Sequence, residues 1–453
     1  MPRFNFYLIL FALFGYALTA GVTLRDRLLI ATLHRIEREA YFEPSAKELF
    51  EGAMLGMTDV LSEEHGDGYT IYIPPSKQVA YQDRADNRSD GLGFLLRTHE
   101  KGGEKKHLIA FPFPEAPAYR AGLRSGDQIV QVDDTSVADK SDDEVLELLK
   151  QRRDAGLRLS ILPFGQTESQ EIFVRAEKYH YGSVTGGYFD SDKQIFCLEA
   201  HPQIGYIWIT SFSGTTAKEF GDALEQMTQS GIESFILDLR DNPGGDVWNS
   251  VQVVKMLIPP GTHRDIIVTS LNRNGRERSF TLVEGEQRTT LPMVVLINGD
   301  TASSSEIVVA ALQDHKRAAV VGTRSFGKGI IQGIFDLPFQ SGMMQLTDAE
   351  YRRPSGAAIH RRANAADSDD WGIIPDKIVE FSEAEESAVA QYRELRARVI
   401  STERLAVLEL FRQQIIDKRS EEEGKLFEFT GAAPYYDFQL DEAIKTLLMQ
   451  KIP

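Results

Sequence analysis

The chain contains a single cysteine, Cys197, among its 453 residues. One cysteine cannot form an intrachain disulfide, and a structural zinc site built from cysteines is excluded as well. The nine histidines form neither an HExxH motif nor another pair at metal-ligand spacing. The sequence therefore implies no metal and no cofactor. Cys197 itself, in the strand-like run QIFCLEA, is expected to be a small buried core residue.

The chain also lacks an excess of positive charge. Fifty Lys and Arg residues stand against 67 Asp and Glu residues, which gives a net charge of −17. No nucleic-acid partner is expected, because phosphate binding requires a concentrated basic face. The one basic cluster is expected on a solvated surface or a substrate-facing loop, and it consists of Arg352, Arg353, Arg361 and Arg362.

Uncharged apolar runs are short except at the N-terminus. Residues 4–22, FNFYLILFALFGYALTAGV, carry no charge. This run is long for the apolar core of a secretory signal and just long enough to span a bilayer. We expect residues 1–22 to be a membrane anchor, with a cleaved signal peptide as the alternative.

The pattern of apolar residues predicts a multidomain α/β protein, since the length suggests about three domains. Residues 23 to about 62 repeat apolar positions at helical spacing, which predicts an N-terminal helical segment at 23–82. The polar stretch 82–91 is expected to be a linker or loop. Residues 83–177 predict strands around one or two helices. Residues 178–382 alternate strands and helices, which favours a largely parallel sheet with crossover helices. Residues 383–453 predict further helices.

Three consecutive serines occur in INGDTASSSEIVVAALQD, residues 297–314. The stretch Ser303 to Glu306 fits S-x-x-E, the capping box that begins a helix. On this stretch alone, a helix cap is favoured over a nucleophile.

Two well-known types of active site do not fit this sequence. GTRSFGKG, residues 322–329, resembles a phosphate-binding loop, but Gly329 replaces the required Ser or Thr and a strand-like run follows instead of a helix. A Ser-His-Asp hydrolase is not indicated either, because G-x-S-x-G is absent. Asp314 and His315 are expected to be surface residues at a helix end.

Lys328 offers a third chemistry. A lysine between glycines and apolar segments could extend to solvent or pair with a carboxylate. It could instead be desolvated, held neutral, and accept a proton from a serine. Ser303 and Lys328 each follow a predicted parallel strand, and the carboxyl ends of such strands open on one edge of the sheet. The predicted topology therefore favours the second interpretation.

Several longer motifs resemble the carboxyl-terminal processing peptidases (tail-specific proteases) of the Ser/Lys type. They are LDLRDNPGG, the run from NGDTASSSE to SFGKGIIQ, and LTDAEYRRPSGAAIHR with DWGIIPD. GLGF together with APAYRAGLRSGDQIVQVDD resembles the PDZ domain of those enzymes. The resemblance covers about residues 30–382. It implies a crotonase/ClpP-like α/β protease core at 178–382, an inserted PDZ domain at 83–177, and helical N- and C-terminal segments at 23–82 and 383–453.

The resemblance assigns roles to individual residues. It implies that Ser303 is the nucleophile, that Lys328 is the general base and that Gln332 orients the lysine amine. Ser304 stands where the family usually has alanine. The implied oxyanion hole consists of the Ser304 N–H and a glycine N–H from Gly244 or Gly245.

The same resemblance implies how substrates are chosen. A PDZ groove binds an unstructured C-terminus by strand addition, and Gly91, Leu92, Gly93 and Phe94 would bind its carboxylate. An arginine after the PDZ helix gates activity in some relatives, and either Arg152 or Arg153 would correspond to it.

The leading hypothesis is an extracytoplasmic, membrane-tethered Ser/Lys endopeptidase of the cell envelope that acts on protein or peptide C-termini. The alternative is a catalytically idle PDZ scaffold that binds the same C-termini. The C-terminal helices are expected to pack structurally, and a homo-oligomer stays open as an alternative.

Overall fold

The structure, a computed structural model, describes residues 23–101, 104–151, 155–190, 193–261, 265–401, 403–424, 426–429 and 436–450. The predicted anchor at 4–22 and the candidate gating residues Arg152 and Arg153 lie outside these ranges. The chain forms two compact units. The first comprises residues up to 78 together with 332–347, and the second comprises 79–331 and the residues from 348 onward.

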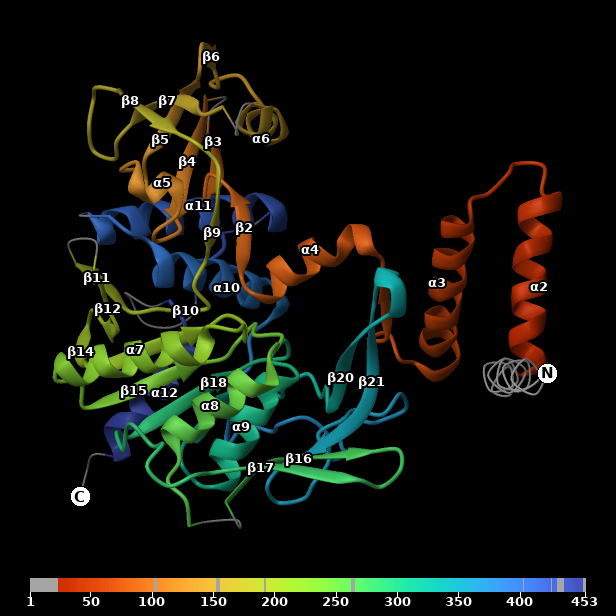
Figure 1. Ribbon diagram of the computed structural model, residues 1–453. Coiled ribbons are helices and arrows are strands. Elements are labelled where there is room, and N and C mark those ends of the chain that lie inside the picture. Colours follow the sequence, from red (N-terminus) through yellow and green to blue (C-terminus); the bar gives the residue numbers. More distant parts are fainter. Residues whose placement is uncertain are drawn as a thin grey trace, which may run out of the picture. The chain divides into compact units, whose positions relative to one another are not determined.

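The first unit contains a helical hairpin and a small strand pairing (Figure 1). Capping boxes at Thr23 and Ser45 begin its two long helices, as the helical periodicity predicts. Strand β1 pairs antiparallel with the start of β21, from Ile71 opposite Gln345 to Ile73 opposite Met343. The elements here are α2 (Leu24–Glu39), α3 (Ala46–His65), β1 (Ile71–Ile73), η2 (Pro338–Gln340) and parts of α4 (Pro75–Ala85), β20 (Ile330–Asp336) and β21 (Met343–Arg352).

The second unit includes residues 83–177, which the sequence predicts to be a PDZ domain and which are called the PDZ domain below. Its six-stranded sheet has the order β3-β4-β5-β7-β8, with β6 paired to β5, so β3 is an edge strand. A separate ribbon of β2 and β9 leads into and out of the domain. Its elements are β2 (Arg88–Gly91), β3 (Phe94–Lys101), β4 (Glu104–Pro112), α5 (Pro117–Arg120), β5 (Gln128–Val132), β6 (Thr135–Ser136), α6 (Asp142–Gln151), β7 (Leu157–Leu162), β8 (Gln170–Val174) and β9 (Glu177–His180).

The core of the second unit is a seven-stranded sheet of order β10-β14-β15-β18-β19-β22, with β13 also paired to β14. The pairings from β14 through β22 are all parallel, which confirms the predicted parallel sheet with crossover helices. The elements of this sheet and its crossovers are β10 (Val184–Thr185), β13 (Cys197–Leu198), β14 (His201–Ile209), α7 (Thr216–Gln229), β15 (Ser234–Asp238), α8 (Val247–Leu257), β18 (Met293–Ile297), α9 (Ser304–Asp314), β19 (Ala319–Gly322) and β22 (Lys377–Ile378). Strands β11 (Tyr188–Asp190) and β12 (Lys193–Ile195) form a separate two-stranded sheet.

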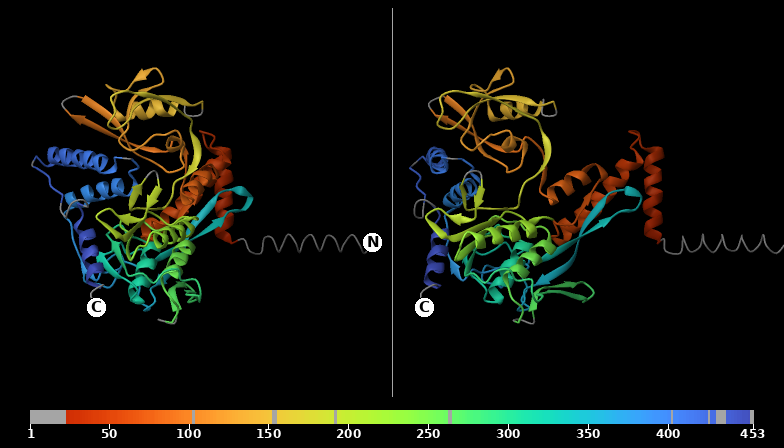
Figure 2. Two further views of the ribbon diagram at one scale, coloured as in Figure 1. Left: turned by 90° about the vertical axis from the view of Figure 1, so that its left-hand side faces the viewer. Right: turned by 60° about the vertical axis from the view of Figure 1, so that its left-hand side comes forward.

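Helices cover both faces of this sheet (Figures 1 and 2). Alternate strand residues such as Leu237 and Val295 pack against α7, α8 and α9, and the intervening ones, such as Ile236 and Val294, pack against α12 (Phe438–Gln450). Because both faces are buried, the strands consist almost entirely of apolar residues. Cys197 is buried in the first of these clusters, as expected.

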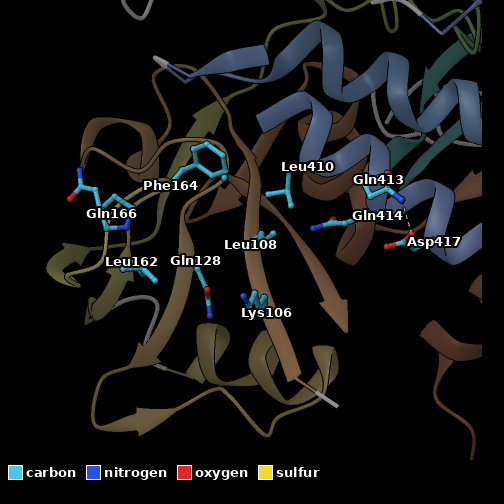
Figure 3. Close-up of a pocket in the computed structure, with 13 residues that line it drawn as sticks. Lys106, Leu108, Gln128, Leu162, Phe164, Gln166, Leu410, Gln413, Gln414 and Asp417 are labelled. Atoms are coloured by element: carbon cyan, nitrogen blue, oxygen red, sulfur yellow. Dashed lines mark hydrogen bonds between the residues drawn. The ribbon is translucent and has the colours of Figure 1, made fainter. Parts of the chain in front are cut away.

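The remaining C-terminal helices, α10 (Glu383–Arg398) and α11 (Arg404–Glu423), pack against the PDZ domain. Strand β4 contributes Leu108 and Phe111 to a buried cluster with Leu395 of α10 and Phe411 of α11. A pocket of about 480 Å³ lies beside this contact, between the PDZ sheet and α11 (Figure 3). The helices predicted at 383–453 are therefore present, and they join the PDZ domain to the core.

Two parts of the fold differ from the sequence-based expectations. The predicted loop at 82–91 is wrong, since α4 continues to Ala85 and Arg88–Gly91 forms β2. Strand β2 is paired with β9, almost ninety residues later, and local polarity does not reveal such a partner. The hairpin of β16 (Ile266–Asn272) and β17 (Glu277–Thr281) was not predicted from the sequence. Strand β16 also pairs with residues 349–352 of β21. None of the helices in the described ranges has the length and apolar character needed to cross a membrane.

Candidate active site

The candidate nucleophile lies where the chain enters α9 from β18. Ser303 has φ 57° and ψ −122°, a backbone conformation that residues other than glycine rarely adopt. Such strain costs about 1–3 kcal/mol and persists only where the surroundings impose it, often at functional sites. Here the Ala302 N–H donates to the Asn242 carbonyl at 3.0 Å, and the Thr301 hydroxyl donates to the Leu239 carbonyl at 2.8 Å. The loop after β18 is thus fastened to the turn after β15.

Glu306 connects the serine to the segment that carries Lys328. The backbone N–H groups of Ser303 and Lys328 both donate to its Oε2, each at 2.8 Å. Its Oε1 accepts from the Ser325 hydroxyl at 2.6 Å and from the Gly327 N–H at 2.8 Å. One half of the predicted capping box is confirmed, because the Glu306 carboxylate accepts a hydrogen bond from the N–H of the cap residue, Ser303. The same carboxylate also holds residues 325–328, which the motif did not predict.

Two opposing effects act on the pKa of the Glu306 carboxyl. Its side chain is fully buried. Burial raises the pKa of this carboxyl above its usual value, although the hydrogen bonds from Ser325, Gly327, Ser303 and Lys328 oppose that rise. Four donors aimed at one buried carboxylate make it a rigid connection rather than a surface group.

Tyr351 joins the same two residues through their carbonyl groups. Its hydroxyl lies within hydrogen-bonding distance of the Ser303 carbonyl oxygen, at 2.8 Å, and of the Lys328 carbonyl oxygen. The tyrosine is buried on β21, and its own N–H donates to the Gly329 carbonyl at 2.9 Å. Ser303 and Lys328, both partly buried, are therefore connected on their N–H side by Glu306 and on their carbonyl side by Tyr351.

The glycine turn after β15 lies directly against the serine. A Cβ on Gly244, which has φ 94°, would lie 2.8 Å from the Ser303 Cβ and 2.9 Å from the Ser304 nitrogen. The Gly244 N–H donates to the Asn242 side-chain oxygen at 2.9 Å, so this donor is already used. Among the described residues, no hydrogen bond involves the N–H of Gly245 or of Ser304. Those two groups are at the N-terminus of α9 and in the turn beside it, where developing negative charge is favoured.

Comparison with known proteins identifies the family. Residues 203–379 match the model of peptidase family S41, and residues 114–162 match a PDZ domain. A carboxyl-terminal-processing protease of Synechocystis sp. is 32% identical over 330 residues, which cover 72% of this chain and 72% of that protein. The chain belongs to the carboxyl-terminal processing proteases of peptidase family S41.

Further relatives carry the same description. A chloroplastic C-terminal processing peptidase of Tetradesmus obliquus is 30% identical over 301 residues, covering 65% of this chain and 63% of that protein. The carboxy-terminal processing protease CtpA of Bacillus subtilis is 29% identical over 328 residues, covering 72% and 65%. The chain is accordingly a serine protease with a PDZ domain, and the alternative of an idle scaffold is not supported.

The PDZ domain of this carboxyl-terminal processing protease has an open groove. A pocket of about 390 Å³ lies between the GLGF loop with β3 on one side and α6 on the other, and its lining includes Gly91 to Leu96, Leu146, Leu149 and Lys150. Because β3 is an edge strand, its outer backbone groups face this groove without a partner strand. The four residues predicted to bind a C-terminus, Gly91, Leu92, Gly93 and Phe94, all line it.

Gln332 belongs to the first compact unit, whereas Ser303 and Lys328 belong to the second. Its side-chain amide donates to the Thr347 hydroxyl at 3.1 Å, and that hydroxyl donates to Asp67 at 3.0 Å. Its predicted role toward the lysine amine stays a prediction.

Two expectations about neighbouring residues need correction. Asp314 and His315 are not surface residues: His315 is buried and donates to the Ile266 carbonyl at 2.8 Å, and Asp314 is paired with Arg353. Both are at the far end of α9 from Ser303. In the basic cluster, Arg353 is thus half-buried in an ion pair, while Arg361 stacks on Trp371 at 4.3 Å.

Sequence reasoning did not find Tyr351, Ser325 or Asn242 as parts of this site. The only available signal was their place inside the family motifs, because Tyr351 contacts Ser303, Ser325 contacts Glu306 and Asn242 contacts Ala302, each from a distant position in the chain. The described ranges contain no group of three or more His, Cys, Asp or Glu side chains able to hold a metal ion.

Proposed function

We propose that Ser303 and Lys328 form the catalytic dyad of this serine protease. The observation that supports the proposal most is the double connection of their backbones, through Glu306 Oε2 and the Tyr351 hydroxyl. Two residues held this closely at the carboxyl edge of a parallel sheet lie where such folds have their sites.

In the proposed reaction, the neutral Lys328 amine takes the proton from the Ser303 hydroxyl as Oγ attacks the scissile carbonyl carbon. The N–H groups of Ser304 and Gly245 stabilise the oxyanion, and Gly244 leaves room for it beside Ser303. The lysine ammonium then donates its proton to the departing amine, which leaves an acyl-enzyme. Water repeats the sequence, with Lys328 again as base and then acid, and releases the carboxylic acid.

A lysine that acts as a base near neutral pH needs a pKa well below the ~10.4 of a free side chain. Desolvation of a lysine amine lowers its pKa because it disfavours the ammonium form. The role that the family resemblance implies for Gln332 stays a prediction: an amide bonded to the neutral amine would not stabilise the ammonium as a carboxylate would.

The PDZ domain is proposed to select substrates by their C-termini. An unstructured C-terminal segment would pair with the edge strand β3, with its carboxylate at the Gly91–Phe94 loop and its apolar side chains against Leu146 and Leu149. Comparing a substrate with a free C-terminus and the same substrate with an amidated C-terminus tests this. Cleavage should be slower for the amidated form, and equal rates would contradict the proposal.

The apolar segment 4–22 is proposed to tether the protease to a membrane outside the cytoplasm. Full-length protein should then stay with membranes through carbonate washing, and a variant that begins at Thr23 should not. Release of the full-length product, with its N-terminus beginning after Gly21, would indicate a cleaved signal peptide instead.

A further inference from the structure

The turn at residues 242–245, which contains the proposed oxyanion donor, is stabilised by residues outside the part of the chain that matches the protease family, 203–379. Asp241 immediately precedes Asn242-Pro243-Gly244-Gly245, and it has φ 58°. Its N–H donates to the Asn298 side-chain oxygen at 2.9 Å, and its carboxylate accepts from the Asn298 amide at 2.5 Å. Asn298 in turn begins the loop that leads to Ser303. Asp241 therefore connects the two loops of the site.

The other oxygen of Asp241 is bound by Arg393 of α10. This arginine lies beyond residue 379, where the match to the protease family ends. Its side chain is only 3% exposed, and its guanidinium lies over the Trp208 ring at 5.4 Å from the ring centre. A buried, stacked guanidinium has few alternative positions, so it fixes the carboxylate that it binds.

A second connection from the C-terminal region reaches the same turn one residue earlier. Arg240 is 1% exposed and donates to Asp238 at 2.6 Å. It also donates to Asp437 and Gln439, each at 3.0 Å, at the beginning of α12. Arg240 is thus bound by residues at the beginning of α12, and the next residue, Asp241, is bound by Arg393 of α10.

We infer that Arg393 is a positioning residue for the protease reaction, acting through Asp241 on the turn that places the Gly245 N–H beside Ser303. The backbone of Asp241 has φ 58°, which costs free energy for a residue with a side chain, and the ion pair with Arg393 helps to hold the turn in this form. Without the guanidinium, the Asp241 carboxylate, 34% exposed, turns toward solvent and the turn relaxes. The inference rests on the proposed oxyanion role of the turn.

The test compares Arg393→Met with Arg398→Met. Arg398 is a matched control because it is on the same helix and lies over the same Trp208 ring at 5.4 Å, yet its acidic neighbour is Glu394 instead of Asp241. With an unstructured peptide substrate, Arg393→Met should lower kcat by about tenfold to a hundredfold, the cost typical of a misplaced catalytic group, with KM little changed. Arg398→Met should keep kcat within about threefold of the wild-type value. Arg393→Lys, which retains the charge, should recover part of the loss.

Asp241→Asn and the double variant Asp241→Asn/Arg393→Met complete the cycle. If Arg393 acts through Asp241, the double variant loses no more kcat than the worse single variant. Equal kcat values in Arg393→Met and Arg398→Met, at comparable melting temperatures, would overturn the inference. Ser303→Ala distinguishes a failure of the proposed dyad from a failure of the role of Arg393. Activity in Ser303→Ala refutes the dyad. An inactive Ser303→Ala together with a fully active Arg393→Met refutes only the role of Arg393.

Discussion

The backbone N–H groups of Ser303 and Lys328, 25 positions apart in the sequence, donate to one oxygen of Glu306. The hydroxyl of Tyr351 bridges the carbonyl groups of the same two residues. Neither connection uses the side chain that would do the chemistry. Both fix the peptide units that carry Oγ and Nζ.

Replacing Glu306 with glutamine should lower kcat by about tenfold or more. Glutamine has one acceptor oxygen, and its NH₂ group would face donors that now bind the carboxylate. Glu219→Gln is the matched control, because the Glu219 carboxylate likewise accepts hydrogen bonds from backbone N–H groups, those of Ser183 and Val184, and from the hydroxyls of Ser183 and Thr215. Both variants should lose about 1–3 kcal/mol of unfolding free energy. Only Glu306→Gln should lose activity beyond that, and equal kcat values would contradict the proposed role.

Removing the Tyr351 hydroxyl isolates the second connection. Tyr351→Phe leaves two partly buried carbonyl groups without this donor, so kcat should fall by about tenfold while the protein stays folded. Tyr72→Phe removes a comparable bond, from a buried tyrosine hydroxyl to the Ser341 carbonyl at 2.6 Å. Peptide hydrolysis by the two variants, each corrected for the folded fraction, is the measurement. A normal rate in Tyr351→Phe would show that Glu306 alone is sufficient.

The PDZ groove can be blocked without disturbing the domain core. Leu146 is 41% exposed and lines the groove, so Leu146→Glu adds a charge that repels a terminal carboxylate. Phe173→Glu changes an exposed apolar residue of β8, outside the groove, in the same way. We expect Leu146→Glu to slow cleavage of a protein with an unstructured tail more than cleavage of a short peptide. Equal loss on both substrates, or equal loss in the Phe173→Glu control, would argue against selection by this groove.

The buried ion pairs of Arg240 with Asp238 and Asp437 predict that the stability of the fold depends on pH. Burial would raise the pKa of Asp238, but Arg240 and Arg393, with hydrogen bonds from Arg240 and Tyr206, outweigh it and lower the pKa to about 2. A depressed carboxyl pKa stabilises the fold above the unfolded value near 3.8, and this contribution is lost as pH falls toward 2.

The expected contribution is about 2 kcal/mol, and it should disappear between about pH 4 and pH 2. Urea unfolding across that range should show a shallower loss of stability in Asp238→Asn than in wild-type protein. Asp134→Asn, at a carboxylate whose side chain is 91% exposed, should keep the wild-type slope. A wild-type slope in Asp238→Asn would contradict the ion-pair account.

The sequence allowed the juxtaposition of Ser303 and Lys328 to be predicted, because each follows a strand of one parallel sheet and such strands end on one edge. It also gave the Glu306 cap, whose partner is three residues away. It did not reveal the contacts made by Ser325, Tyr351 and Arg393, which depend on separations of 19, 48 and 152 residues from their partners. Local periodicity carries no information about such long-range pairs. The pairing of β2 with β9 was missed for the same reason.

Peptide hydrolysis by Lys328→Arg tests the Ser/Lys assignment most directly. A guanidinium keeps the positive charge but cannot be deprotonated in a protein, so it cannot accept the serine proton. Lys255→Arg, at a lysine whose side chain is 12% exposed and pairs with Glu286, controls for the substitution itself. The account predicts that Lys328→Arg loses at least about 10⁴-fold in kcat, as Ser303→Ala should, with fold and C-terminal peptide binding intact and Lys255→Arg fully active. Hydrolysis by Lys328→Arg at a rate near that of the wild type would contradict it.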